Sequence, residues 1–144
     1  MNILSTGKHC LALVCVLCAT QAFAITATDL LAQGATPLSE EDIKAVSQDQ
    51  TLDHKMLGTR LVAPIYYGTN GTRIVNATAF GGKIYNTKWW TDNGKRCEIS
   101  AKNKDTQCGL VFKREKDYLV CFDQEEQCAW TFTARPGNPD KLGE

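Results

Sequence analysis

The amino-acid sequence predicts a mainly β fold, an antiparallel meander of about seven strands curled into a barrel or half-barrel with one short N-terminal helix. From Gly58 onward, turn-forming residues recur at nearly even intervals, for example at Asn70-Gly71, Gly81-Gly82 and Asn93-Gly94. Between these turns lie short runs rich in valine, isoleucine, threonine and aromatic residues, which is typical of consecutive antiparallel strands. A long meander has open edges, and curling is the common way to protect them.

The helix is predicted to begin near Leu38 and to run to about Ser47. Ser39 is a suitable N-cap, acidic residues fill the first turn, and Leu38 can pack back on the helix as a hydrophobic staple. Leu38, Ile43 and Val46 form a narrow apolar stripe. Because so short a helix is not stable alone, we expect this stripe to rest on the strands, with the helix covering one barrel opening.

The strands that follow are separated by glycine-containing turns and by short polar groups. Pro64 cannot donate a ladder hydrogen bond, so we expect the first strand to be an edge strand or to be bulged there. The segment after Arg135, which contains Pro136 and Pro139, should be irregular. The strands are expected near residues 59–67, 72–80, 83–91, 95–101, 108–113, 117–122 and 128–134.

Residues 1–24 have the pattern of a secretory signal peptide. Lys8 precedes an apolar run from Cys10 to Ala19, and the small-x-small triplet Ala22-Phe23-Ala24 offers a cleavage site before Ile25. The apolar run is roughly 10 residues, against the roughly 20 that a membrane-spanning helix needs, so we expect cleavage and no integral membrane span afterwards. The predicted location is the periplasm or the extracellular medium.

Cleavage would leave 120 of the 144 residues, enough for one domain with a single core. We expect an irregular segment over residues 25–37 and one β-rich domain over residues 38–144, present as a monomer. Lys8 is the one charged side chain removed, so 15 basic and 16 acidic residues remain, a net charge of −1. This balance argues against a nucleic-acid binder and against a binder of anionic membranes.

Removing the signal peptide also changes the cysteine count from seven to four, namely Cys97, Cys108, Cys121 and Cys128. An even number of cysteines in an exported chain favours disulfides. Zinc sites usually use closely spaced pairs, whereas the gaps here are 10, 12 and 6 residues, so no metal or other cofactor is predicted.

Three connectivities are open from the sequence alone. We favour Cys97 with Cys108 and Cys121 with Cys128, because each pair would face across two adjacent strands of a hairpin. Strand alternation places Cys97 on the face of Ile99 and Cys128 on the face of Trp130, so both disulfides are expected within the core.

The sequence contains no recognisable catalytic arrangement, and we expect no enzymatic activity. After cleavage the one histidine is His54, in a polar stretch that resembles a solvated loop. Carboxylates such as Glu98 and Asp123 fall mostly in turns or among lysines, where solvated surface charges are the ordinary explanation. A glycine-rich phosphate loop is also missing, since Gly81-Gly82 lies between two predicted strands.

Two adjacent aromatic pairs within predicted strands, Tyr66-Tyr67 and Trp89-Trp90, are the candidate binding residues. Neighbours on a strand point to opposite faces, so one member of each pair must leave the principal core. The outward residue either lies under the helix or a loop, or it contributes to a surface that holds a ligand, for which Trp and Tyr are well suited.

The chain from Pro37 to Leu142 resembles a family of small exported bacterial proteins, domain of unknown function 995. The resemblance rests on Leu38-Ser39-Glu40-Glu41-Asp42-Ile43, on Tyr66-Tyr67-Gly68-Thr69-Asn70-Gly71-Thr72, on the Gly81 to Trp90 segment, on Cys97 with Cys108, and on Pro136-Gly137-Asn138-Pro139. It implies a periplasmic or secreted domain of the bacterial envelope with no assigned reaction. Cys121 and Cys128 are additional to the family's usual pair.

These observations together predict a non-enzymatic, disulfide-stabilised β-domain that binds a small ligand, an envelope component or a protein partner. One alternative is an inhibitor of a lysozyme-like or other exported enzyme, by analogy of fold. A second alternative is a hydrolase that uses surface carboxylates, which would need two of them roughly 5 to 10 Å apart in a cleft.

Export, processing and oxidation predict one intact mass. Protein purified from the envelope of its host, alkylated without reduction, should have the mass of residues 25–144 less the four hydrogens lost in two disulfides. No cysteine should carry the alkylating group. A full-length mass with alkylated thiols would contradict both the signal peptide and the disulfides.

Overall fold

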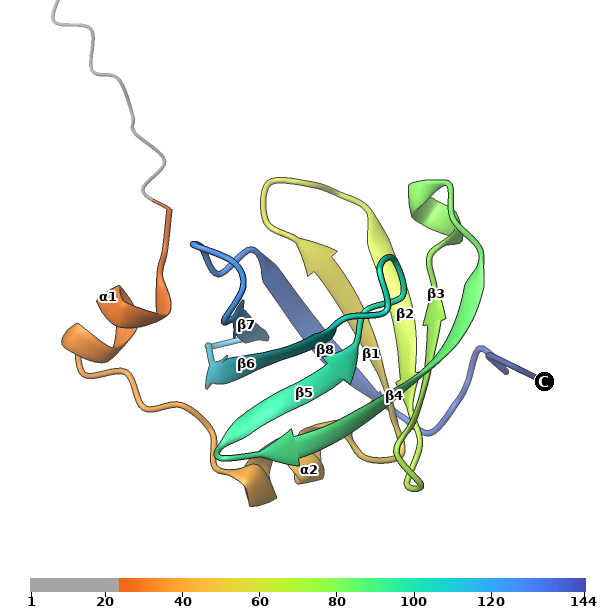
Figure 1. Ribbon diagram of the computed structural model, residues 1–144, viewed down its shortest axis with the longest axis horizontal. Coiled ribbons are helices and arrows are strands. Elements are labelled where there is room, and N and C mark those ends of the chain that lie inside the picture. The colour runs from red at the N-terminus through yellow and green to blue at the C-terminus, as the bar shows by residue number, and fades with distance from the viewer. Residues whose placement is uncertain (1–23) are drawn as a thin grey trace, which may run out of the picture.

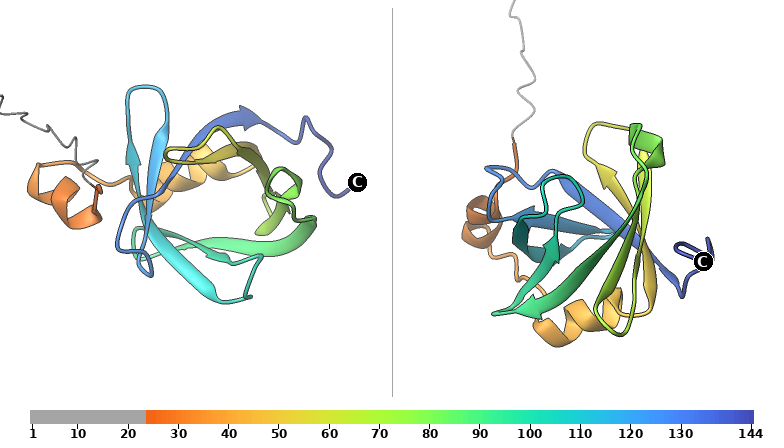
Figure 2. Two further views of the ribbon diagram at one scale, coloured as in Figure 1. Left: turned by 90° about the horizontal axis from the view of Figure 1, so that it is seen from above. Right: turned by 45° about the vertical axis from the view of Figure 1, so that its right-hand side comes forward.

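The computed structural model describes residues 24–144, so the predicted signal peptide up to Phe23, with Ala22 of its cleavage site, lies outside the described residues. Eight strands, each hydrogen-bonded to the next, close into an antiparallel barrel because β8 pairs with β1. Seen from above, the strands form a ring (Figure 2). The predicted mainly β fold and its curling are confirmed.

The elements follow the chain in up-and-down order (Figure 1). Two short helices, α1 (Ala27–Ala32) and α2 (Glu40–Ser47), precede the strands, and a 3-10 turn, η1 (Thr78–Phe80), interrupts them. The strands are β1 (Gln50–Met56), β2 (Val62–Tyr67), β3 (Thr72–Asn76), β4 (Ile84–Asp92), β5 (Lys95–Ile99), β6 (Thr106–Lys113), β7 (Tyr118–Phe122) and β8 (Trp130–Pro136).

Strand β1 is the one strand that the sequence pattern does not predict, and it brings the count from about seven to eight. Its sequence, QTLDHKM, is mostly polar and lacks the usual strand pattern. The strand forms because its polar side chains find partners on both faces of the sheet. Leu52 and His54 are buried, while Asp53 pairs with Arg135 of β8 at 2.6 Å between carboxylate and Nε. The expectation that His54 lies in a solvated loop is therefore wrong.

Pro64 also differs from its prediction, since a closed barrel has no edge strand. It pairs with Asp53 of β1 inside a continuous register, without a bulge. The pairing between β2 and β3 begins only at Ile65, so Pro64 carries a ladder on one side alone. A residue without an N–H is tolerated where only one neighbouring strand pairs with it.

Helix α2 begins where the sequence predicts, with Ser39 as the N-cap and a reciprocal capping box to Asp42. Ile43 is completely buried in the hydrophobic cluster inside the barrel, and Leu38 packs against the same cluster. The helix crosses one barrel opening, at the bottom of Figure 1. We call this the helix end.

Helix α1 lies within residues 25–37, which the sequence predicts to be irregular. Thr26 and Asp29 form a second capping box, and this local set of hydrogen bonds defines the six-residue helix. Its Ala27 and Leu30 pack against a separate cluster outside the barrel, made of Phe112, Leu119, Cys121 and Cys128. The N-terminal segment therefore covers the outer face of β6 and β7.

Two disulfides link the pairs that the spacing favours, Cys97 with Cys108 and Cys121 with Cys128. Cys97, Cys121 and Cys128 are buried in core packing, as expected, although neither disulfide lies in the barrel interior. Cys97 alternates with the inward residues of β5, and Cys121 belongs to the cluster under α1. Strand β8 begins at Trp130, so its alternation does not extend back to Cys128. The Cys97–Cys108 disulfide joins β5 to β6, and the Cys121–Cys128 disulfide joins β7 to the β7–β8 connection, both outside the barrel interior.

Candidate functional site

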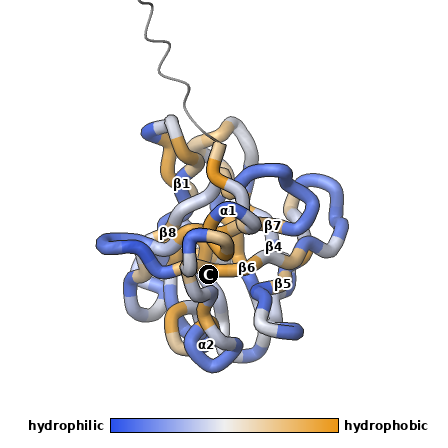
Figure 3. Tube along the Cα trace, turned by 90° about the vertical axis from the view of Figure 1, so that its left-hand side faces the viewer, coloured by the Kyte–Doolittle hydropathy of each residue, from blue (hydrophilic) through white to orange (hydrophobic). Residues whose placement is uncertain are grey.

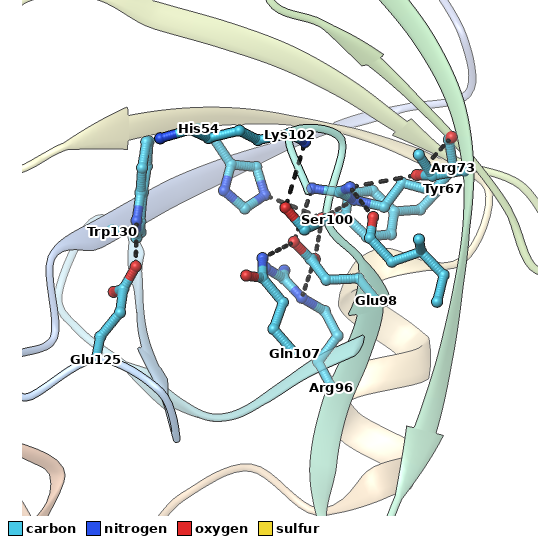
Figure 4. Close-up of polar contacts among 12 residues, drawn as sticks. His54, Tyr67, Arg73, Arg96, Glu98, Ser100, Lys102, Gln107, Glu125 and Trp130 are labelled. Carbon is cyan, nitrogen blue, oxygen red and sulfur yellow. Dashed lines mark hydrogen bonds and ion pairs between the residues drawn. The ribbon is translucent and has the colours of Figure 1, made fainter. Parts of the chain in front are cut away.

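The barrel interior contains a cluster of polar side chains from four strands (Figure 4). His54 comes from β1, Tyr67 from β2, Arg73 from β3, and Arg96 and Glu98 from β5. Each of these five side chains is buried. We call them the charged cluster.

Glu98 is the centre of the charged cluster. Its Oε1 accepts from Nη2 of Arg73 at 2.7 Å and from Nε2 of Gln107 at 2.9 Å, and its Oε2 accepts from the hydroxyl of Tyr67 at 3.1 Å. The Nε of Arg96 lies 3.6 Å from Oε2, which makes a second ion pair. One carboxylate thus faces two guanidinium groups.

The hydroxyl of Tyr67 joins His54 to this network. It accepts from Nε of Arg73 at 3.2 Å and lies 3.2 Å from Nε2 of His54. Because a hydroxyl has one proton and Tyr67 donates it to Glu98, Nε2 of His54 must be the protonated nitrogen of the ring. Neutral His54 therefore fits here as a hydrogen-bond donor.

The charges in the cluster do not balance. Burial, together with the positive charges of Arg96 and Arg73, lowers the pKa of His54 well below its usual value, so this ring is neutral. Burial works against the ionised form of Glu98, but Arg73 and Arg96 outweigh it and lower the pKa of Glu98. Two guanidinium cations and one carboxylate leave one surplus positive charge inside the barrel.

Arg96 carries the surplus. It is completely buried, and none of its three side-chain nitrogens has a hydrogen-bond partner within residues 24–144. Its guanidinium carbon instead lies 5.1 Å from the ring centroid of Tyr67 and 5.0 Å from that of Phe132. Cation–π attraction from two rings offsets part of the cost of burying the charge.

The charged cluster is closed to solvent, so its side chains support the barrel rather than contact a dissolved molecule. Glu98, which the sequence places among surface carboxylates, is 1% exposed. Within residues 24–144, no three histidine, cysteine or carboxylate side chains gather as a group that could hold a metal ion. A binding site must therefore be sought on the outside of the barrel.

The four predicted binding aromatics divide between two faces, as strand alternation requires. Tyr67 and Trp89 point into the barrel, where their rings meet edge to face with centroids 5.4 Å apart. Tyr66 points outward and donates to Asp49 at 2.9 Å, and Trp90 is 37% exposed. The structure does not bring these four residues together as one surface.

Trp90 lines a shallow cleft of about 260 Å³ between α2 and the adjoining strands. Its walls include Lys44 of α2, Gln48 directly after that helix, and Thr69 of the β2–β3 turn. Two of the predicted aromatics, Trp89 and Trp90, line this cleft, and a larger group of exposed apolar side chains lies elsewhere.

The end of the barrel opposite α2, which we call the loop end, is formed by the β1–β2, β3–β4, β5–β6 and β7–β8 connections. Six of the nine exposed large apolar side chains of the described residues lie there. Apolar stretches of the trace are visible at the top of Figure 3 beside β1. We call these six residues the apolar rim: Met56, Leu57, Leu61, Val62, Phe80 and Ile84.

Cations accompany the apolar rim on the same three connections. The exposed residues Lys55, Arg60, Lys83, Lys102 and Lys104 lie on or beside the β1–β2, β3–β4 and β5–β6 connections, with Asp105 as the one acid. The acids of the loop end gather instead in the β7–β8 connection, at Asp123, Glu125 and Glu126. No local sequence pattern reveals this segregation, because the connections are far apart in the chain.

Comparison of the chain with family models, with curated proteins and with solved structures found no match in any of the three. Over residues 24–144, no helix has the length and apolar character needed to cross a membrane.

The unbalanced cluster predicts opposite outcomes for two substitutions. Glu98→Gln should destabilise the fold by roughly 3 to 5 kcal/mol, because both guanidinium groups lose their counter-charge. Arg96→Met should change stability by less than about 1 kcal/mol or raise it, because an apolar chain replaces a buried cation that has no hydrogen-bond partner, and Glu98 keeps its closer partner Arg73. Urea unfolding of both variants measures the difference. An Arg96→Met variant as unstable as Glu98→Gln would contradict the surplus-charge argument.

His54 predicts an acid-sensitive fold. Its pKa in the folded state lies well below the unfolded value of 6.5, so below that pH the unfolded chain binds more protons and stability falls. The free energy of unfolding should begin to decrease as the pH falls through 6.5 and should keep decreasing until the lower folded-state pKa is reached. His54→Gln should flatten that decrease. An equal slope in both proteins would contradict burial of the neutral ring.

Proposed function

We propose that the chain is an exported, non-enzymatic binding protein whose binding surface is the apolar rim at the loop end. The observation that carries this proposal is the concentration of six exposed apolar side chains at one end of the barrel. Exposed apolar side chains are ordinary when scattered, whereas a contiguous group marks an interaction site. The mouths of β-barrels are also frequent binding sites.

The architecture supports this assignment. Helix α2 covers the opposite end with Ile43 and Leu38, and the N-terminal segment covers the outer face of β6 and β7. The apolar rim lies at the loop end, which neither α2 nor the N-terminal segment covers. Two disulfides stabilise the barrel and fit an oxidising compartment, which supports the proposed export to the periplasm or the medium.

The predicted aromatics take a smaller part in this proposal than the sequence gives them. Tyr67 and Trp89 help to fill the barrel, and Trp90 with an edge of Trp89 lines a separate side cleft. An enzyme inhibitor would present the same apolar rim to its target. A panel of muramidases and proteases therefore separates that alternative from other binding roles, and inhibition of one of them would favour it.

The rim should bind an apolar fluorescent probe. Folded protein titrated with anilinonaphthalene sulfonate should give a saturable increase in fluorescence, since the probe buries its rings against exposed apolar side chains. Leu61→Ser should lower that signal severalfold. Leu31→Ser is the matched control, because Leu31 on α1 is 47% exposed and Leu61 is 46% exposed.

Both variants should unfold at the same urea concentration as the parent, since each replaces a surface side chain. An equal loss of signal from both leucines, or no saturable signal, would contradict the rim as the binding surface.

A further inference from the structure

We infer that the apolar rim and its neighbouring cations dock on an anionic lipid surface, so that the barrel rests on a membrane by its loop end. This inference rests on the proposed function, because it names the partner of the same rim. It follows from the packed interior, from the mixture of side chains on three connections, and from the separation of charge around the loop end.

The packed interior argues against a small molecule that descends into the barrel. Tyr67, Arg96 and Phe132 are each at most 1% exposed, and their side chains stack against one another across the interior. A barrel of eight strands has an interior just wide enough for its own side chains to fill. The apolar rim therefore offers its surface outward, to something that lies across the loop end.

The rim has the composition of a membrane-contacting surface. Leu57, Leu61 and Val62 of the β1–β2 connection are exposed, and Phe80 and Ile84 of the β3–β4 connection join them at the same end. Side chains of this kind bury themselves in the boundary between headgroups and acyl chains, and lysine or arginine beside them adds attraction to anionic lipid.

An aromatic contact links the apolar β3–β4 connection to the start of β8. The rings of Phe80, the last residue of η1, and Trp130, the first residue of β8, meet edge to face with centroids 6.5 Å apart. Strands β1, β2 and β3 separate these positions around the sheet, so the contact reaches across the barrel rim. Figure 4 shows Trp130 at this end with its Nε1 donating to Glu125. Aromatic rings with one polar tip are suited to a membrane interface.

The charges at this end are separated into two regions. Five exposed cations accompany the apolar connections against a single acid, Asp105, whereas Asp123, Glu125 and Glu126 occupy the remaining connection. The acidic connection would face away from an anionic surface if the barrel tilts toward its basic half. A net charge near zero for the chain conceals this separation.

Lysine is the main cation beside the rim, which favours a lipid over a protein partner. Lys83 and Lys104 both place their ammonium groups over the ring of Tyr85, at 5.7 and 5.4 Å from its centroid. Lysine is depleted in protein–protein interfaces. Its long apolar stem with a charged tip is instead suited to the edge of a lipid layer.

Vesicle co-sedimentation tests the inference, with protein expressed from the full chain and purified after export and processing. Two vesicle types are compared, phosphatidylcholine alone and equal parts of phosphatidylcholine and phosphatidylglycerol. Binding should occur only to the anionic vesicles and should weaken as salt is added, because salt screens exposed charges.

Two substituted pairs provide the matched comparison. Lys102→Glu with Lys104→Glu at the loop end should reduce partitioning at least about tenfold, since each lysine near an anionic surface contributes severalfold to binding. Lys113→Glu with Lys116→Glu makes the same change of charge at the helix end and should leave partitioning unchanged. Leu61→Ser should reduce it, and Leu31→Ser should not.

The outcomes separate this inference from the proposed function. Loss of vesicle binding on substituting the loop end alone supports both. If the rim binds the fluorescent probe but neither type of vesicle, the lipid inference is overturned. The proposed binding role of the rim then stands, with a protein as its partner. Equal binding to both vesicles, or equal loss from both lysine pairs, also overturns it. Absence of both probe and vesicle binding overturns the inference and the proposed function together.

Discussion

The carboxylate of Glu98 is the one group that allows two guanidinium ions to lie inside this barrel. It faces Arg73 directly and Arg96 at longer range, and Tyr67 and Gln107 complete its hydrogen bonds. Removing charges from water is expensive, and attraction repays that cost only with good geometry and satisfied partners. The positions of four strands around one another are therefore tied to a single side chain on β5.

The two ends of the barrel are closed differently. A helix with a buried isoleucine covers the helix end, whereas four connections of unequal composition form the loop end. The polar interior between them contributes to a rigid barrel rather than to a binding cavity. Recognition on such a scaffold belongs to the exposed connections, which the strands hold in fixed relative positions.

Much of this architecture could be predicted from the sequence because its signals are local. The capping box at Ser39, the turns at Asn70-Gly71 and Asn93-Gly94, and the spacing of the four cysteines each act within a few residues. Strand β1 was missed because its polar residues are satisfied by partners in β2 and β8, which no local pattern reveals. A local pattern does not reveal the apolar rim for the same reason, since η1 comes to lie beside β2 only when β2 and β3 pair.

Closure of the barrel has a consequence for the order of folding. Each disulfide joins cysteines 11 or 7 positions apart, within a single hairpin, whereas Arg135 and Asp53 on the closing strands are 82 positions apart. Contacts between distant segments form slowly, because a long loop must be ordered before any contact rewards it. The hairpins should therefore form and oxidise first, and pairing of β1 with β8 should be the late step. Until then, β1 and β8 are unpaired edges, and the chain is most open to aggregation during that interval.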